Sequence, residues 1–285
     1  MKLSLLVPVL NYESTLPETV ERIRGLPSGE AHEVLVIFDV TNADWQEKVE
    51  QARSGLDERF KARSIVRTDE RGFGSALRAG AAAATGDLLM PVMADLSDDL
   101  AVIPAMIRKI EEGADVVVGA RYITGGGIVG NTAKQQLSRF YSRIASVLTD
   151  VGCGDISNSF KMYRREVWEA VRPRSESFDL SAELLVKAAA LGYRVDQVPA
   201  TWVNRQIGRS NFRLYREFMS YTRWLALAVL CMPSRWTILA GLSLPLLIRP
   251  VARRLLLADS RRIAGTPDSI ANGAEMRTGV GETKR

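Results

Sequence analysis

The stretch at residues 86–99 reads Gly-Asp-Leu-Leu-Met-Pro-Val-Met-Ala-Asp-Leu-Ser-Asp-Asp, an apolar run that ends in three carboxylates within five residues. The apolar part, residues 88–92, is long enough for a buried strand. In open α/β sheets, ligands bind outside the carboxyl ends of the strands, so acids at this point favour a cation and a diphosphate. The alternative is a polar loop in which Ser97 or Asp98 caps a helix that begins near Leu100.

Short apolar runs alternate with helical patterns on both sides of this stretch. Strands are predicted at 3–10, 34–38, 64–67, 88–92 and 116–119, and helices at 16–26, 45–56, 73–84 and 103–111. The strands lack strict polar alternation, which is typical of strands covered on both faces. We therefore predict an α/β fold with a mostly parallel, Rossmann-like sheet flanked by helices. Beyond residues 125–127 the pattern is less regular, with helices near 137–149 and 181–191.

Composition excludes several classes of protein. The chain has 285 residues, of which 46% are hydrophobic and 25% charged, as expected of a globular protein. Its net charge is +5, and no basic run is interleaved with aromatics, so we expect no nucleic-acid partner. Two cysteines, Cys153 and Cys231, and one histidine, His32, argue against a disulfide framework and a histidine-built zinc site.

A glycine-rich segment begins at Gly72 and Gly74. It fits the dinucleotide-binding fingerprint poorly, because Leu77 occupies the place of the third glycine and the segment follows the third predicted strand. A helix that begins here could donate backbone N–H groups to an anionic ligand. The alternative is that the glycines only allow tight packing between strand and helix.

Several segments, in this order along the chain, resemble the family 2 glycosyltransferases of GT-A fold, and in particular the polyprenol-phosphate (dolichol-phosphate mannose synthase-like) subgroup. The segments are residues 6–11 (Leu-Val-Pro-Val-Leu-Asn), 33–39, 72–80, 85–87, 94–97, 118–122, 155–161, 198–200 and 205–210. The resemblance implies a GT-A fold and the inverting transfer of a hexose from a GDP- or UDP-sugar to polyprenyl phosphate.

The resemblance also implies roles for individual residues. The donor-binding set would be Pro8, Val9, Asn11, Asp39, Gly72, Gly74, Ala94 and Asp95, with Pro8, Val9 and Asp39 around the base and ribose. Asp95, helped by Ser97 or Asp98, would hold Mg²⁺ or Mn²⁺ on the diphosphate. The catalytic set would be Asp95 with Arg121, Lys134 and Ser138, which receive the acceptor phosphate, and Arg205, which lies on the diphosphate.

The sequence departs from the family pattern at the metal site. Where the family has Asp-x-Asp, this chain has Met93-Ala94-Asp95, so one expected ligand is a thioether, which suits hard cations badly. Asp98 and Asp99 are candidates to compensate. Leu10, Phe38 and Asn211 also differ from the residues common in the family.

Two other functions stay open. One is transfer to a sugar hydroxyl on a glycan or glycolipid, for which Glu183 is the candidate base. The other is a non-catalytic nucleotide-sugar-binding subunit, which Met93 suggests. A phosphate acceptor needs no strong base, because its second pKa lies near about 6 and the attacking oxygen is already ionised at neutral pH.

The C-terminal region bears on the acceptor. Residues 212–225 form an amphipathic pattern that either packs on the domain or faces a membrane. The apolar stretches 224–232 and 236–248 are each shorter than the roughly 20 residues of a spanning helix, and Arg235 interrupts them. We expect a peripheral or re-entrant helical pair on the cytoplasmic face of the membrane. The predicted division is a catalytic domain at 1–210, membrane-associated helices at 211–263 and a disordered tail at 264–285.

Overall fold

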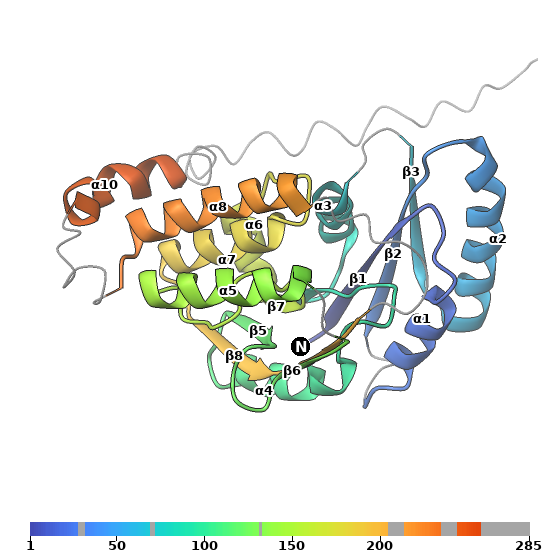
Figure 1. The fold of residues 1–285 in the computed structure, drawn as a ribbon. Helices are drawn as coiled ribbons and strands as arrows, with labels where there is room; N and C mark the ends of the chain where they lie inside the picture. Colours follow the sequence, from blue (N-terminus) through green and yellow to red (C-terminus); the bar gives the residue numbers. More distant parts are fainter. Residues whose placement is uncertain (28–31, 69–71, 131–132, 205–213, 235–243, 258–285) are drawn as a thin grey trace, which may run out of the picture.

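The protein is built on one seven-stranded sheet with helices on both faces (Figure 1). The structure, a computed structural model, describes residues 1–27, 32–68, 72–130, 133–204, 214–234 and 244–257. The strand order is β3-β2-β1-β4-β7-β5-β8. The strands are β1 (Leu3–Leu10), β2 (Glu33–Asp39), β3 (Arg63–Arg67), β4 (Leu88–Pro91), β5 (Val116–Ala120), β7 (Lys161–Arg164) and β8 (Val195–Pro199). Within this sheet all neighbours pair in parallel except β7, which is antiparallel to both β4 and β5.

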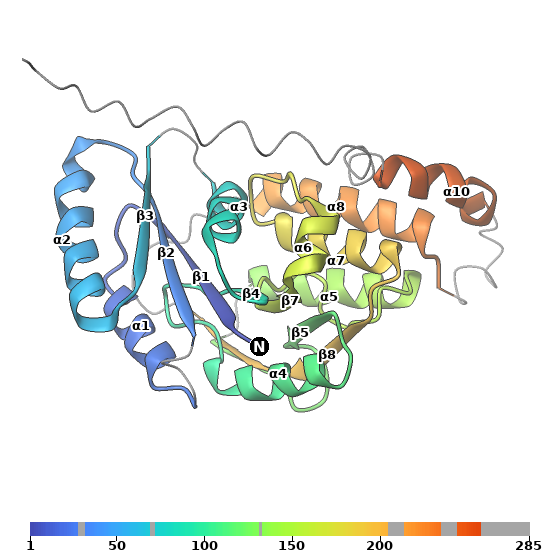
Figure 2. The same cartoon turned by 180° about the vertical axis from the view of Figure 1, so that it is seen from behind.

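A second, two-stranded sheet pairs β6 (Gly127–Val129) with β9 (Thr201–Val203) in parallel. One face of the large sheet carries α1 (Leu16–Arg24), α2 (Ala43–Phe60) and α4 (Ile103–Glu111), the last preceded by the short 3₁₀ helix η2 (Leu100–Val102). The other face carries α3 (Phe73–Ala83), α5 (Ala133–Leu148), α6 (Arg165–Val171), α7 (Leu180–Leu191) and α8 (Leu214–Cys231), with α10 (Leu244–Leu256) packed on α8 (Figure 2).

Two apolar cores follow from the alternation of side chains along β1. Leu5 and Val7 point into the core shared with α1, α2 and α4, whereas Leu6 points into the core shared with α3. Side chains on successive strand positions point to opposite faces, so a strand between two helical layers must be apolar throughout. The predicted α/β architecture with a mostly parallel sheet is confirmed.

Strand β7 was not anticipated by the sequence pattern. It has only four residues, and Lys161 and Arg164 at its ends give it a polar appearance. Inside the sheet, Tyr163 and Met162 are fully buried between β4 and β5. A strand of four residues that is buried because it pairs on both edges is too short to show an apolar periodicity in the sequence.

Helix α8 packs on the domain through one stripe. Glu217, Tyr221, Trp224, Ala228 and Cys231 are buried at spacings of three and four residues. Tyr141 of α5 donates a hydrogen bond to the carbonyl of Tyr221 at 2.6 Å. The predicted packing alternative for this helix is thus correct for one of its faces, whereas Phe218 and Met219 are exposed.

In the part of the chain that the structure describes, no helix is both long enough and apolar enough to cross a membrane. The predicted tail at 264–285 lies outside the described residues, as does Arg235.

Glu33, at the start of β2, ties three parts of the fold together. Its carboxylate accepts hydrogen bonds from Ser4 Oγ on β1, from the Thr85 N–H at 2.7 Å and from the Arg63 guanidinium. Burial alone would raise the pKa of Glu33, but these hydrogen bonds outweigh it and lower the pKa to about 2.

We expect Glu33→Gln to destabilise the protein by about 2 kcal/mol at pH 7. The folded-state pKa lies below the ordinary value of 4.5, so the carboxylate stabilises the fold above that pH. This contribution is lost as the pH falls toward 2, and the gap between parent and variant should close there. Urea unfolding at pH 7 and pH 3 measures it, with Glu58→Gln on the exposed face of α2 as control. An equal gap at both pH values would contradict the assignment.

Candidate functional site

Asn11 joins the carboxyl ends of β1 and β2. It adopts a left-handed φ of 58°, a conformation that asparagine tolerates better than most residues. Its side-chain oxygen accepts the Thr41 N–H at 2.8 Å, and its own N–H donates to the Asp39 carbonyl at 2.9 Å. Pro8 and Val9 lie just before it, paired with the end of β2. Four residues of the predicted donor-binding set therefore meet at one edge of the sheet.

The buried carboxylate of Asp39 connects β2 to two further segments. Its Oδ1 lies 3.1 Å from Nη1 of Arg67 at the end of β3, and its Oδ2 accepts the Gly72 N–H at 2.9 Å. Arg67 also donates to Ser75 Oγ at 3.2 Å. Arg67, whose side chain is 11% exposed, is a cation at this edge of the sheet that the sequence pattern did not indicate. The available signal was its charge at the last position of a predicted strand.

Gly72 and Gly74 lie against the backbone of residues 175–176. A Cβ atom at either glycine would collide with a carbonyl oxygen there, and Gly72 has a φ of 139°. The Gly74 N–H donates to the Glu176 carbonyl at 2.8 Å, and Asp39 accepts the Gly72 N–H. Both N–H groups are thus engaged within the protein, which supports the tight-packing alternative for these glycines.

The acid loop, residues 93–99, follows β4 at the same edge. Asp98 Oδ2 accepts the Met93 N–H at 2.7 Å, and Asp95 Oδ1 accepts the Ser97 N–H at 3.2 Å. Leu96 between them has a φ of 60°. Asp99 is the residue that precedes η2, and no side chain caps that helix. The alternative in which Ser97 or Asp98 caps the next helix is therefore wrong.

Other elements hold the acid loop in place. Thr15 and Thr19 donate to the Ala94 carbonyl at 2.7 and 3.0 Å, which fixes the loop to the start of α1. The Ser97 carbonyl accepts the Val203 N–H at 3.0 Å, and the Asp99 carboxylate accepts the Thr201 N–H at 3.1 Å. Strand β9 thus runs along the acid loop.

The carboxylates of the acid loop lie close together and are poorly solvated. Burial raises the pKa of Asp98 to about 7; the Met93 N–H and the Arg121 guanidinium oppose this shift, whereas the carboxylates of Asp95 and Asp99 add to it. Like charges in a poorly solvated loop disfavour ionisation. The involvement of Arg121 also shows that the acid loop and the end of β5 share one electrostatic environment.

A divalent cation would relieve this accumulation of negative charge. Among the residues that the structure describes, no three or more His, Cys, Asp or Glu side chains gather closely enough to form a metal site. Asp95 and Asp98 offer hard oxygen ligands, whereas the Met93 thioether does not suit Mg²⁺. Mg²⁺ usually keeps several waters and is completed by substrate phosphates. The loop fits a cation held jointly with a diphosphate, but not an all-protein site.

Arg121, directly after β5, is held by Asp155 through two parallel hydrogen bonds. Nε donates to Asp155 Oδ2 at 2.7 Å and Nη2 to Oδ1 at 2.9 Å, and the Arg121 backbone N–H also donates to Oδ2, at 3.0 Å. Burial alone would raise the pKa of Asp155, but the guanidinium holds it below its usual range. This bidentate geometry fixes the plane of the guanidinium. The sequence pattern indicates no role for Asp155, although its segment carries the family resemblance.

Two hydroxyl groups also meet Nη2 of Arg121. Nη2 donates to Ser157 Oγ at 3.0 Å and to Ser138 Oγ at 3.3 Å. Tyr122 donates to Ser138 Oγ at 2.9 Å. The predicted pair Arg121 and Ser138 is therefore in direct contact. Lys134 lies on the same helix, one turn before Ser138.

Two residues of the predicted catalytic set are not fully described by the structure. The side chain of Lys134 and all of Arg205 lie outside the described residues.

Beneath this cluster, a buried lysine closes the loop that carries Asp155. Lys161 Nζ donates to the carbonyls of Ile156, at 3.2 Å, and Asn158. Burial lowers the pKa of Lys161 to about 8. The Asn158 side chain in turn donates to the Gly119 carbonyl on β5 at 2.6 Å. The loop at 155–158 is thus locked to β5, which keeps Asp155 opposite Arg121.

Comparison with known proteins identifies this arrangement. The model of the family described as glycosyl transferase family 2 matches residues 4–172. The chain belongs to glycosyl transferase family 2. It is 30% identical over 218 residues to the dolichol-phosphate mannosyltransferase of Pyrococcus furiosus, covering 75% of this chain and 60% of that protein. It is 27% identical over 217 residues to the undecaprenyl-phosphate 4-deoxy-4-formamido-L-arabinose transferase of Klebsiella pneumoniae subsp. pneumoniae, covering 75% and 64%.

Solved structures confirm the GT-A-like fold of this family 2 chain. Glucosyl-3-phosphoglycerate synthase from Mycobacterium tuberculosis, in complex with phosphoglyceric acid, matches with a TM-score of 0.57 at 19% identity, covering 80% of this chain and 79% of that one. The same protein with Mn²⁺, UDP-glucose and phosphoglyceric acid matches with a TM-score of 0.55 at 20% identity, covering 80% and 78%. The matched part of the present chain spans less than two thirds of the length of the two curated relatives.

Glu183, the candidate base of this family 2 chain for a hydroxyl acceptor, is fully engaged in the structure. Its Oε2 accepts the N–H groups of Arg174 and Ser175 at 2.9 and 2.7 Å, and its Oε1 pairs with Lys187 at 2.6 Å. Its side chain is 2% exposed. Glu183 thus holds the loop before α7 and is not placed to accept a proton from a substrate.

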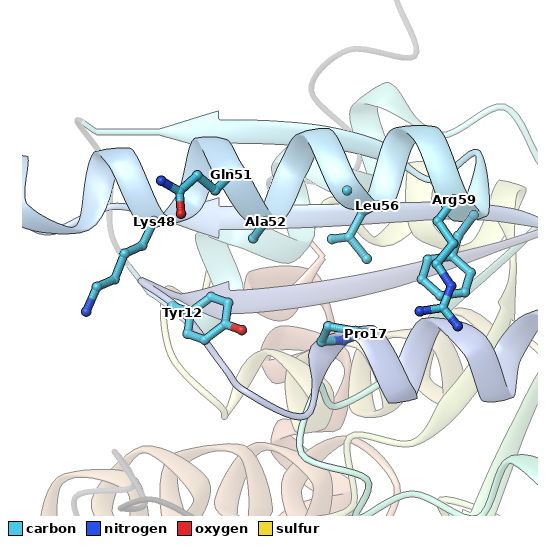
Figure 3. A pocket seen from close by; sticks show the side chains of 9 residues that line it. Tyr12, Pro17, Lys48, Gln51, Ala52, Leu56 and Arg59 are labelled. Carbon is cyan, nitrogen blue, oxygen red and sulfur yellow. The ribbon is translucent and has the colours of Figure 1, made fainter.

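A groove of about 560 Å³ lies between α1 and α2 (Figure 3). Its lining is Tyr12, Pro17, Lys48, Gln51, Ala52, Gly55, Leu56, Arg59 and Phe60. None of these belongs to the predicted donor, acceptor or metal sets. One lining residue, Tyr12, directly follows Asn11 of the predicted donor-binding set.

We expect Asp155→Asn to lower the free energy of unfolding of this family 2 protein by about 3 kcal/mol, because it leaves the buried Arg121 charge uncompensated. Urea unfolding followed by circular dichroism measures the loss. Asp150→Asn, an exposed carboxylate near the end of α5, is the matched control and should stay near the parent. A stable Asp155→Asn protein would show that the pair does not hold this edge together.

Proposed function

We propose that this chain is an inverting glycosyltransferase that moves a hexose from a GDP- or UDP-sugar to polyprenyl phosphate at the cytoplasmic face of a membrane. The observation that carries the proposal is the contact of Arg121 with Ser138 and Asp155 beside the acid loop. A fixed cation next to carboxylates suits a reaction between two phosphorylated molecules. The names of both curated relatives support this choice, since each contains a polyprenol phosphate.

In this proposal the donor lies across the ends of β1, β2 and β4. Pro8, Val9, Asn11 and Asp39 surround the base and ribose, and Arg67 supplies positive charge near Asp39. Ala94 and Asp95 bring the acid loop to the diphosphate. Gly72 and Gly74 act by closing the junction between β3 and α3, since their N–H groups serve protein acceptors.

The leaving group is a nucleoside diphosphate, so negative charge grows on its oxygens as the bond to the sugar C1 breaks. Asp95, with Ser97 or Asp98, would hold Mg²⁺ or Mn²⁺ at this place, and the cation would stabilise that charge. Structural neighbours of the same fold were solved with Mn²⁺ or Mg²⁺ and UDP. Arg205 is proposed to lie on the same diphosphate.

The acceptor is proposed to be a phosphate monoester bound by Arg121, Lys134 and Ser138. An acceptor oxygen forms the new bond to C1 on the face opposite the leaving group, which departs with the bonding electron pair and leaves the configuration inverted. No proton needs to be removed, because the monoester is ionised at neutral pH. The engagement of Glu183 favours this acceptor over a sugar hydroxyl, which would need a base.

The division of labour along the chain is part of the proposal. Residues 1–210 form the catalytic domain, and residues 211–263 contact the membrane as interfacial or re-entrant helices. Support comes from the outer face of α8, where Phe218 and Met219 are exposed.

We expect Asp95→Ala to abolish the cation-dependent part of nucleotide binding, and Met93→Asp to strengthen it about tenfold, because a second carboxylate replaces a poor ligand for a hard cation. Calorimetric titration of Mg²⁺ or Mn²⁺ with GDP or UDP present measures both effects. Asp44→Asn, an exposed carboxylate at the start of α2 and outside the acid loop, is the control. If Asp95→Ala binds the cation like the parent, the acid loop is not the metal site.

Incubation of the protein with labelled GDP- and UDP-sugars and polyprenyl phosphate tests the reaction itself. We expect an organic-extractable, mild-acid-labile product with one donor, and a loss of at least about 100-fold in turnover with Arg121→Gln, because Arg121 binds the attacking phosphate. Lys109→Gln on α4 is a control cation away from the site. A labelled product on a glycan or glycolipid hydroxyl, or donor binding without turnover, would contradict the proposal.

A further inference from the structure

The hydroxyl group of Tyr221, on the buried stripe of α8, lies between two loops of the domain. It donates to the Phe178 carbonyl at 2.8 Å, and the Ser157 carbonyl accepts from it at 3.4 Å. Helix α8 packs against both α5 and α7, and Tyr221 is 7% exposed (Figure 1). Phenylalanine would fill the same space, so the hydroxyl is needed only for these hydrogen bonds.

The first of the two loops carries Ser157, which lies at the centre of the predicted acceptor site. Ser157 Oγ accepts a hydrogen bond from Arg121 Nη2 at 3.0 Å and lies 2.8 Å from Ser138 Oγ. The same hydroxyl donates to the Asp155 carboxylate at 3.3 Å. A shift of the Ser157 backbone would therefore move a group that touches both Arg121 and Ser138.

The second loop, which carries Phe178, is held by contacts of its own. The Phe178 ring stacks on Phe73 of α3, with ring centroids 4.5 Å apart and an angle of 19° between the ring planes. Two residues earlier, the Glu176 carbonyl accepts the Gly74 N–H at 2.8 Å. The Tyr221 hydroxyl is thus anchored at the Phe178 carbonyl, and from there it reaches the Ser157 carbonyl.

Tyr221 itself is fixed in place and protonated. Its ring meets the Tyr141 ring edge to face, with centroids 5.8 Å apart. Burial raises the pKa of Tyr221, so the hydroxyl keeps its proton at neutral pH and acts as a hydrogen-bond donor. The Arg121 guanidinium opposes this shift in pKa, which places Tyr221 in the same electrostatic environment as the predicted acceptor site.

We propose that Tyr221 is a positioning residue for the acceptor phosphate, an inference that rests on the proposed function. Its hydroxyl holds the backbone of Ser157, and Ser157 in turn keeps Arg121 and Ser138 at the spacing that binds a phosphate. A group that acts in this way changes the affinity for the acceptor. It leaves the affinity for the donor unchanged, because the donor-binding residues at the ends of β1 and β2 have other contacts.

Tyr221→Phe tests this role, because it removes the hydroxyl and keeps the ring. With a labelled sugar donor and geranyl phosphate as the acceptor, we expect the KM for geranyl phosphate to rise about fivefold, the effect of one lost hydrogen bond. The KM for the nucleotide sugar and kcat should stay within about twofold of the parent values. Tyr163→Phe is the matched control, since Tyr163 is fully buried and its hydroxyl has no hydrogen-bond partner among the described residues.

A second variant, Ser157→Ala, separates positioning from a merely structural role. Because Tyr221 acts through Ser157, Tyr221→Phe should not raise the KM for geranyl phosphate further when Ser157 is already alanine. The same fold-change in both backgrounds would overturn the inference. So would an acceptor KM that is equal in the parent and Tyr221→Phe, or a donor KM that rises in parallel with it.

These outcomes differ from a failure of the proposed function. No transfer by the parent to either geranyl phosphate or polyprenyl phosphate would refute the proposed reaction. Calorimetric titration with geranyl phosphate then still tests the role of Tyr221. Binding that is about fivefold weaker in Tyr221→Phe than in the parent would support the inference. An equal Kd, or no binding by the parent, would overturn it.

Discussion

The buried ion pair between Arg121 and Asp155 is the interaction on which the functional edge of this protein depends. Two charges that are removed from water cost free energy unless geometry and further hydrogen bonds compensate. Here four further hydrogen bonds supply that compensation. The backbone N–H groups of Arg121 and Asn158 and the hydroxyl groups of Ser142 and Ser157 all donate to the Asp155 carboxylate. The result is a guanidinium with one fixed orientation at the carboxyl end of β5.

The antiparallel strand β7 is what makes this pair possible. Because β7 runs against β4 and β5, its amino end lies at their carboxyl ends, with Lys161 paired to Val118. The loop before β7 therefore lies at the same edge of the sheet as the acid loop. A parallel strand in this position would have placed residues 155–158 at the opposite edge. The antiparallel strand β7 thus brings the loop at 155–158 and the acid loop to one edge of the sheet.

The sequence predicted the parts of this fold that have a local signal. Strands such as 3–10 and helices such as 103–111 were recognisable because apolar periodicity is a property of neighbouring residues. The contact between Arg121 and Ser138 came from the family resemblance and not from periodicity. Strand β7, the role of Asp155 and the cation Arg67 were missed, because each depends on partners that are distant in sequence. For Asp155 the partner is 34 residues away.

Glu183 and the glycines show why a motif needs its surroundings. In sequence, Glu183 was a candidate base and Gly72 a candidate anion binder, and both proposals were chemically sound. In the structure, the Glu183 carboxylate meets Lys187 and two backbone N–H groups, and Gly72 donates to Asp39. A carboxylate that is 2% exposed and already meets three donors of its own protein is not available to a substrate hydroxyl. Under the proposed function, this edge positions two anionic substrates, and fixed cations matter more for that task than a base. An acceptor that arrives already ionised is the one that such a site serves best.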